Sequence, residues 1–100
     1  DKELKEACCV LRNLSNTSTE DQLATAVEAG AFKVLTRGLL SSSEAVKVAL
    51  RAVNGYLKRA TPRTPFLIPF REAGGIEALK NCGGEYEFEV NLILANYFPE

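Results

Sequence analysis

Apolar residues near the start of the chain recur at the spacing of one face of an α-helix. These positions are three or four residues apart and are Leu4, Ala7, Cys8, Leu11 and Leu14. The pattern predicts a helix that runs to about Ser15 and buries this face. The polar run Asn-Thr-Ser-Thr at 16–19 is expected to end the helix,.

Capping residues and a glycine divide the next forty residues into short helices. Thr19 or Ser18 can cap a helix that ends near Val27, because a hydroxyl oxygen at the N-cap accepts a hydrogen bond from a free backbone N–H,. Gly30 interrupts the chain after this helix,. Two more helices are predicted, over residues 31–40 and from 44 to about 58, with the serines at 41–43 between them.

The helix at 44–58 repeats the apolar pattern of the first helix. Each apolar position of the first helix has a counterpart 42 residues later, namely Val46, Ala49, Leu50, Val53 and Tyr56. A second marker, Glu-Ala-Gly followed by a small residue, occurs at 28–31 and at 72–75, a spacing of 44 residues. Helix triplets with an internal period near 42 are typical of α-helical solenoids, whose repeats have about 40–47 residues.

The last third of the chain is expected to begin a further unit. Prolines at 62, 65 and 69 predict an extended loop over 61–70,. Its apolar end at 66–70 either packs down, in part as a short helix, or forms an exposed patch that docks a partner. Gly83 and Gly84 are expected to end the helix that follows the second marker. A final helix over about 86–98 then places on its core face Phe88, Leu92, Ala95 and Phe98, each 42 residues after its counterpart.

Composition narrows the function classes. The 100 residues are 46% hydrophobic and 25% charged, as in an ordinary soluble globular domain,. The chain has no histidine, so it lacks the usual general base near neutral pH and the commonest metal ligand. We therefore expect no enzymatic activity, no metal and no cofactor. Cys9 is the one candidate nucleophile, and it has no histidine to activate it.

The three cysteines indicate a reducing compartment. Cys8 and Cys9 are neighbours in a predicted helix, where adjacent side chains diverge by roughly 100° and a bridge would be strained. Cys82 then has no partner. Unpaired cysteines favour a cytoplasmic, or alternatively nuclear, protein, with Cys8 packed as a small apolar residue. No apolar run approaches the roughly 20 residues of a membrane span, and the uncapped helical pattern at 1–6 predicts a piece of a longer chain.

The recurring segments resemble armadillo repeats. Ala-Cys-Cys-Val-Leu-Arg-Asn-Leu-Ser at 7–15 is similar to the end of that family's third helix. The two Glu-Ala-Gly markers are similar to its glycine elbow, and Leu-Leu-Ser-Ser at 39–42 is similar to its second-to-third turn. The resemblance implies an all-α, right-handed α-helical solenoid of about two and a third repeats. Residues 1–16 would be the last helix of a first repeat, 17–59 a full repeat, and 60–100 a full or terminal repeat.

Two armadillo subfamilies share features with the chain. Ala-Leu-Arg-Ala-Val at 49–53 and the terminal Tyr97-Phe98 are similar to the C-terminal repeats of importin-α, a nuclear transport adaptor. Val-Leu-Arg-Asn-Leu-Ser at 10–15 is instead similar to repeats of the catenin and plakophilin group. Importin-α repeats bind nuclear localisation signals through a Trp and an Asn four residues later. This chain has no Trp, and the matching Asn positions are Asn13, Gly55 and Asn96.

Stacked third helices line the concave face of such a solenoid, so their polar sides form a candidate partner-binding surface. In this chain the candidate residues are Lys5, Cys9, Arg12, Asn13, Asn16, Lys47, Arg51, Asn54 and Lys58. With neighbouring helices about 10 Å apart, Lys5 is expected beside Lys47. Asparagines can pair with the backbone of an extended peptide, and Lys and Arg attract carboxylates or phosphates.

The charge distribution predicts a protein partner that is acidic along the first two repeats. All 12 basic residues lie within 1–80, whereas Glu85, Glu87, Glu89 and Glu100 lie in the last twenty residues. The partner must therefore tolerate a change in the sign of the charge that it faces, from positive along the first two repeats to negative near the C-terminus. The net charge of −1 gives no reason to expect nucleic acid or an anionic membrane as partner,.

Two alternatives to a partner-binding groove are open. The Lys and Arg side chains are equally compatible with an ordinary solvated surface. The chain is also compatible with a C-terminal cap of a longer solenoid, in which Phe88, Tyr97 and Phe98 seal the terminal core. A cap of this kind would be marginally stable alone or would self-associate, because about three repeats are usually needed for stability.

Overall fold

The computed structural model describes residues 2–41, 44–60, 66–82 and 84–98, and within these ranges all regular structure is helical. The long helices are α1 (Lys2–Thr17), α4 (Ala45–Lys58) and α7 (Glu87–Tyr97). The shorter ones are α2 (Glu20–Glu28), α3 (Ala31–Leu40), α5 (Leu67–Glu72) and α6 (Gly75–Lys80), and the 3₁₀ turn η1 (Gly84–Tyr86) precedes α7. The all-α class is therefore confirmed.

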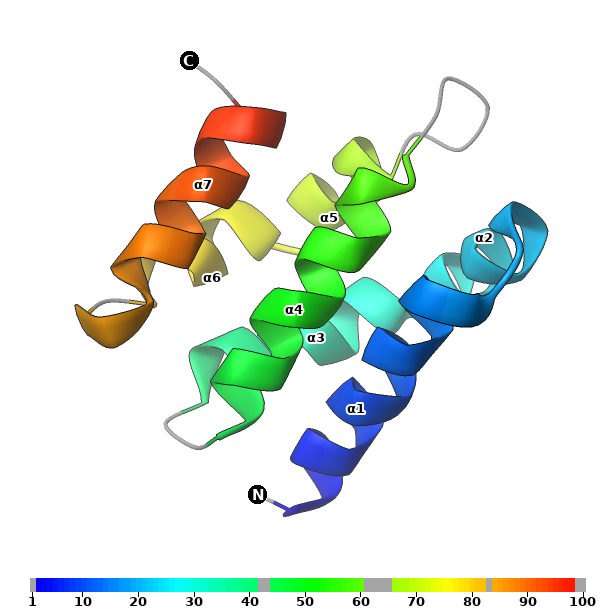
Figure 1. Ribbon diagram of the computed structural model, residues 1–100, viewed down its shortest axis with the longest axis horizontal. Helices are drawn as coiled ribbons and strands as arrows, with labels where there is room; N and C mark the ends of the chain where they lie inside the picture. The colour runs from blue at the N-terminus through cyan, green and yellow to red at the C-terminus, as the bar shows by residue number, and fades with distance from the viewer. Residues whose placement is uncertain (1, 42–43, 61–65, 83, 99–100) are drawn as a thin grey trace.

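The helices are arranged in two layers. α1, α4 and α7 lie side by side in one layer and run in the same direction, with the shorter helices behind them (Figure 1). α1 packs against α4 along its length, whereas α7 contacts α4 much more sparsely. The molecule measures 34 × 34 × 20 Å. The smallest dimension fits two helix layers at the usual interaxial distance of about 8–10 Å.

The boundaries at the start of α2 follow from side-chain hydrogen bonds. The N–H of Gln22 donates to Thr19 Oγ1 (3.2 Å) and the N–H of Thr19 donates to Gln22 Oε1 (2.9 Å), which is a capping box,.

α1 continues through Thr17, beyond the predicted end near Ser15. The polar run does not stop it, and the Thr17 hydroxyl donates within the helix to the carbonyl of Asn13 (2.9 Å).

The two Glu-Ala-Gly markers build the same elbow. Gly30 has φ 106° and precedes α3, and Gly74 has φ 83° and precedes α6. These are left-handed conformations that a residue with a Cβ rarely adopts. The N–H of Gly30 donates to the carbonyl of Val27 (3.1 Å), and that of Gly74 donates to Arg71 (3.0 Å). The recurrence seen in the sequence is therefore a recurrence of backbone geometry.

The apolar segment before the second elbow packs down. Phe66 and Phe70 are buried, and α5 forms over Leu67–Glu72. Pro69 lies in the first turn of α5, where its missing N–H leaves no helical bond unmade. The packed interpretation of 66–70 is confirmed for Phe66 and Phe70, whereas Ile68 is 60% exposed. Of the extended loop predicted over 61–70, residues 67–70 belong to α5, and residues 61–65 lie outside the described residues, as do the serines at 42–43.

Phe32 of α3 is the centre of an aromatic cluster in the core. Its ring makes edge-to-face contacts with Tyr56 (5.6 Å between centroids), Phe66 (6.3 Å) and Phe70 (5.4 Å). Phe70 in turn stacks on Phe98, at the end of α7 (5.8 Å). Such ring pairs add to the free energy of burying the rings themselves. The cluster joins α3, α4, α5 and the end of α7.

The buried face of α7 differs from the predicted one. Phe88 is 71% exposed, and Leu92 and Ala95 are also exposed. The prediction that these residues face the core was wrong, and among the predicted set Phe98 is the buried member. The residues of α7 that pack against the core are Val90, Ile93, Leu94 and Tyr97.

A two-residue difference in spacing explains this error. Val90 and Ile93 lie 44 residues after Val46 and Ala49, which is also the spacing of the two elbows. The extra two residues therefore fall between the end of α4 and the second elbow. A register error of two residues turns a helix by roughly 200°, which exchanges its buried and exposed faces.

α1 and α4 are in close contact where Gly55 meets Ser15. A Cβ built on Gly55 would overlap the Ser15 hydroxyl and lie 2.9 Å from the Ser15 Cβ. Ser15 is buried, and its hydroxyl donates to the carbonyl of Arg12 (2.6 Å). The Arg59 guanidinium also donates to the Ser15 carbonyl (3.1 Å). Gly55, at a position that matches the ligand-binding Asn of importin-α repeats, is a packing contact between the two long helices.

Phe32→Ala is expected to lower the free energy of unfolding by about 3–5 kcal/mol, because it leaves a cavity at the centre of the aromatic cluster. Phe88→Ala is the matched control and should change it by less than about 0.5 kcal/mol, because Phe88 is largely exposed,. Urea denaturation followed by circular dichroism measures both values. Equal destabilisation by the two variants would contradict the observed register of α7.

Gly55→Ala is expected to lower the free energy of unfolding by about 1–3 kcal/mol, despite the better helix propensity of alanine, because the new Cβ overlaps Ser15,. Ser15→Gly removes the Ser15 Cβ and hydroxyl, which are the atoms that the new Cβ would overlap. In the double variant, Gly55→Ala should then cost less than it does in the parent chain. Additive effects in this double-mutant cycle would show that the two residues do not touch in solution.

Candidate partner-binding groove

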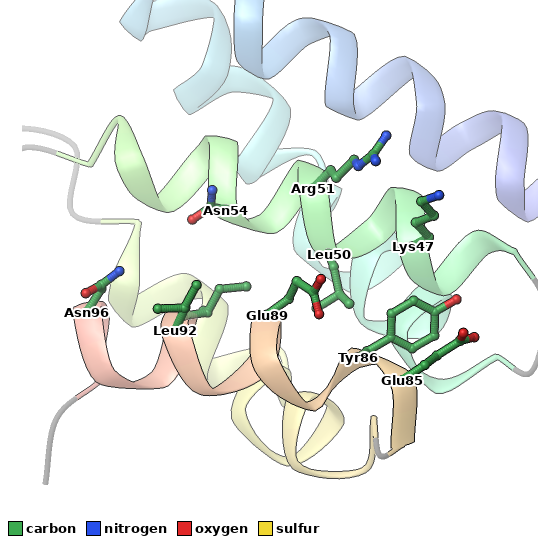
Figure 2. Close-up of a pocket in the computed structure, with 10 residues that line it drawn as sticks. Lys47, Leu50, Arg51, Asn54, Glu85, Tyr86, Glu89, Leu92 and Asn96 are labelled. Atoms are coloured by element: carbon green, nitrogen blue, oxygen red, sulfur yellow. The ribbon is translucent and has the colours of Figure 1, made fainter.

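A groove of about 450 Å³ lies between α4 and α7 (Figure 2). Its α4 side consists of Lys47, Leu50, Arg51 and Asn54. Its other side, from η1 and α7, consists of Glu85, Tyr86, Glu89, Leu92, Ile93 and Asn96. Leu50 and Ile93 are almost fully buried and form the apolar floor of the groove.

The two walls of the groove carry opposite charge. Lys47 and Arg51 are exposed on the α4 wall, and Glu85 and Glu89 are exposed on the opposite wall. Figure 2 shows Arg51 directed away from α7. Within the described ranges, no ion pair joins these cations to these carboxylates. All four charges can therefore meet a ligand without first breaking a salt bridge.

Amide and phenol groups lie at the two ends of the groove. Asn54 and Asn96 face the same end, and Tyr86 lies with Lys47 and Glu85 at the other (Figure 2). Partial burial raises the pKa of Tyr86, and the neighbouring Glu85 carboxylate raises it further. The phenol therefore stays protonated at neutral pH and remains a hydrogen-bond donor. The groove offers neutral donors and acceptors at both ends and charges along its sides.

Three of the nine predicted site residues line this groove, namely Lys47, Arg51 and Asn54. Lys5 forms an ion pair with Glu44 instead (Nζ to Oε2, 2.5 Å). This hydrogen-bonded pair raises the pKa of Lys5 and lowers that of Glu44. Lys5 thus links the beginnings of α1 and α4, and its charge is partly neutralised there.

The other predicted residues lie along α1 and at the end of α4. Asn16 and Lys58 line a separate shallow hollow of about 540 Å³ at the C-terminal ends of the two helices. The Arg12 guanidinium is within 3.5 Å of the Asn13 side-chain oxygen. Cys9 is half-buried and packs against the core. The structure therefore does not gather the nine residues in one groove.

The α7 wall of the groove was missed by reasoning from sequence. Glu85 and Glu89 had been recognised only as a change of sign, and Leu92 had been assigned to the core. The 44-residue spacing of the elbows predicts the correct register of α7. Applied to α7, it turns Leu92 outward and places Ile93 at the position of Ala49.

Two of the three thiols are buried and poorly suited to reaction. Burial raises the pKa of both Cys8 and Cys82, so they stay protonated at neutral pH,. The Cys82 thiol lies 3.2 Å from the Leu39 carbonyl and 3.3 Å from the Ala78 carbonyl. The expectation that Cys8 lies in the core is confirmed.

Neither a metal centre nor a membrane span is found in the part of the chain that the structure describes. No group of three or more Cys, Asp or Glu side chains there is placed to hold a metal ion. No helix there combines the length and the apolar character needed to cross a bilayer.

Comparison with known proteins gives no match. No family model matches the sequence, no curated protein matches it, and no solved structure matches the chain.

Tyr56 is a buried titratable group outside the groove. Its side chain is fully buried, and its hydroxyl has no hydrogen-bond partner among the described residues. Burial raises the pKa of Tyr56 to about 12. The unfolded chain ionises a tyrosine near pH 10. Between these values the unfolded state binds fewer protons, so stability must fall as the pH rises.

Tyr56→Phe is expected to leave the free energy of unfolding at pH 7 unchanged or to raise it by about 1 kcal/mol, because it removes an unpartnered buried hydroxyl,. Above pH 10 the variant should lose less stability than the parent chain, since it lacks the group whose pKa is raised to about 12. Urea denaturation at neutral and alkaline pH measures both effects. A marked loss of stability at pH 7 would show that the hydroxyl has a partner.

Proposed function

We propose that this chain is a non-enzymatic protein-interaction scaffold that holds a segment of a partner protein in the groove between α4 and α7. The observation that carries the proposal is the groove itself. Its walls have opposite charges that are not paired with each other, and its floor is apolar. Such a surface recognises a chain of mixed polarity better than a small uncharged molecule.

The proposal includes a right-handed solenoid of armadillo-type repeats. Three features support this assignment: the parallel layer of α1, α4 and α7, the shorter helices behind it, and the two equivalent glycine elbows. In such a stack each long helix presents one side to a shared surface, so neighbouring helices can follow one extended ligand. The division at 1–16, 17–59 and 60–100 belongs to the same proposal.

The partner's chemistry follows from the groove walls. Acidic side chains of the partner would meet Lys47 and Arg51, as the sequence predicted, and basic ones would meet Glu85 and Glu89,. An apolar side chain would enter over Ile93. The asparagines at one end can pair with the partner's backbone,. The free cysteines support a reducing compartment, cytoplasmic or nuclear, as the place of action,.

A second candidate function is a C-terminal cap of a longer solenoid, as in the tail of a nuclear transport adaptor. Phe98 supports it, because this residue is buried, stacks on Phe70 and lies under the Arg71 guanidinium (5.7 Å from the ring centroid). Phe88, which is exposed, takes no part in the seal. The cap and the groove use different residues, so the two functions are separable.

A random linear-peptide phage library panned on the immobilised chain would test the groove. Peptides with acidic residues should be enriched, and their affinity should fall at least tenfold on Lys47→Glu with Arg51→Glu, a loss of about 1.4 kcal/mol. Fluorescence anisotropy at low and at physiological salt gives the affinities.

Lys33→Glu with Arg37→Glu is the matched control, because it makes the same charge change on exposed positions of α3 outside the groove. This variant should bind the selected peptides as the parent does. Circular dichroism checks that both double variants remain folded. Equal affinity for the groove variant and the parent at low salt would end the groove proposal.

A further inference from the structure

Tyr86 and Tyr97 are the two tyrosines with partly exposed side chains, whereas Tyr56 is fully buried. The two exposed tyrosines differ in their sequence neighbours. Three glutamates, at 85, 87 and 89, lie within three residues of Tyr86, and all three side chains are exposed. Tyr97 has a single carboxylate within the same distance, that of Glu100. Tyr86 is therefore the phenol that an enzyme with a basic substrate cleft would select.

The backbone around Tyr86 is held less firmly than the other end of α7. Tyr86 is the N-cap residue of this helix, and its side chain makes no capping hydrogen bond. The first buried residue of α7 is Val90, so the first turn has few contacts to lose and opens at low cost,. At the other end, Phe98 is buried and stacks on Phe70 (5.8 Å between centroids). An enzyme can therefore draw out the residues around Tyr86 without unfolding the core.

A phosphate on Tyr86 would change the charge of the groove. Tyr86 and Lys47 line the same end of it (Figure 2). In the unmodified groove, the charges of Lys47 and Arg51 balance those of Glu85 and Glu89. A phosphotyrosine adds a charge of about −1.5 to −2 at pH 7 and three strong acceptor oxygens. The balanced groove thus becomes a negative one.

The groups around the phenol also determine where the phosphate would turn. Partial burial raises the pKa of Tyr86, and the carboxylates of Glu85, Glu44 and Glu89 raise it further, so all three act on this position. The same carboxylates repel a phosphate. Lys47 is the cation that lines this end of the groove, and the phosphate is expected to turn toward it,. Lys47 is then no longer available to an acidic group of a partner.

We infer that Tyr86 is a phosphorylation site whose modification reverses the charge preference of the groove. The inference rests on the proposed function, because it assigns a regulator to the same groove. A protein tyrosine kinase transfers the γ-phosphoryl group of a nucleoside triphosphate to Tyr86 Oη. The new Oη–P bond replaces the bond from that phosphorus to the β–γ bridging oxygen, the phenol loses its proton, and the nucleoside diphosphate leaves. The unmodified groove takes acidic segments, whereas the phosphorylated groove rejects them and takes basic ones.

Phosphate incorporation into the folded chain tests the site. A panel of purified tyrosine kinase domains that prefer acidic substrates is supplied with ATP and with single variants of the chain. Tyr86→Phe should abolish incorporation. Tyr97→Phe should be modified at the rate of the parent chain, because Tyr97 is not the acceptor and does not line the groove.

Glu87→Gln is the control that separates recognition by the kinase from recognition by the groove. Glu87 is next to Tyr86 in the sequence and exposed, but it does not line the groove. The variant should be phosphorylated at least about threefold more slowly, because the kinase loses one of the charges it reads. Its affinity for acidic peptides should equal that of the parent chain.

The effect on binding is measured on a chain with phosphotyrosine incorporated at position 86 during synthesis, so that it does not depend on a kinase. The acidic peptides selected by phage display should bind this chain at least about tenfold more weakly than they bind the parent. Their charge-inverted counterparts, with Lys in place of Asp and Glu, should bind it more tightly. Treatment with a phosphatase should restore both affinities, and circular dichroism checks that the fold is unchanged.

Three results would overturn the proposal. If a peptide of residues 81–92 is phosphorylated and the folded chain is not, the fold hides Tyr86. If neither is phosphorylated, the residues around Tyr86 are not read by these enzymes. If the phosphorylated chain binds both kinds of peptide as the parent does, the phosphate does not control the groove. In each case, acidic peptides that lose affinity on Lys47→Glu with Arg51→Glu would still support the groove, so the two proposals can fail separately.

Discussion

The contact of the Phe32 ring with its aromatic neighbours is the interaction on which the rest of the structure depends. Phe32 comes from one of the short helices, yet it touches Tyr56 of α4 and Phe70 of α5, and Phe70 continues the contact to Phe98. The two walls of the groove belong to α4 and α7, which contact each other sparsely. The position of α7 relative to α4 therefore depends largely on the aromatic contacts in the core, from Tyr56 through Phe32 and Phe70 to Phe98.

This arrangement explains why the two junctions in the long-helix layer differ. At the α1–α4 junction a glycine lets the helices approach until Gly55 and Ser15 touch, and beside this contact lies the shallow hollow at the C-terminal ends of the two helices. At the α4–α7 junction the helices contact each other sparsely, and Tyr86 and Leu92 line an open groove between them. The two junctions of this layer thus differ in how closely the helices pack, and the α4–α7 junction carries charges of opposite sign on its two walls.

Local rules predicted most of the helices, because their signals lie within a few residues of each boundary. The bounds of α3 at Ala31–Leu40, the cap at Thr19 and the turn at Gly30 all follow from short-range chemistry. The face of α7 did not follow, because it depends on the length of a connection that the local pattern does not specify. Phe88 is as apolar as Val90, and only the elbow spacing distinguishes the outer residue from the inner one.

The site was predicted only in part for a related reason. Residues on the α4 wall could be found from helix periodicity, since α4 lies in the correct register. Lys5 could not be excluded in advance, because its partner Glu44 is distant in sequence and comes close only when α1 and α4 pack together. Pairing across helices of this kind depends on the packed arrangement rather than on the local sequence.

The position of Tyr86 at one end of the groove has a practical consequence. The chain contains no Trp, so its ultraviolet emission comes from three tyrosines, of which one is in the core and one lies in the groove. A ligand that carries an indole would accept excitation energy from Tyr86 at short range. The chain therefore has a built-in optical donor at the place where occupancy is to be measured, and no dye needs to be attached to it.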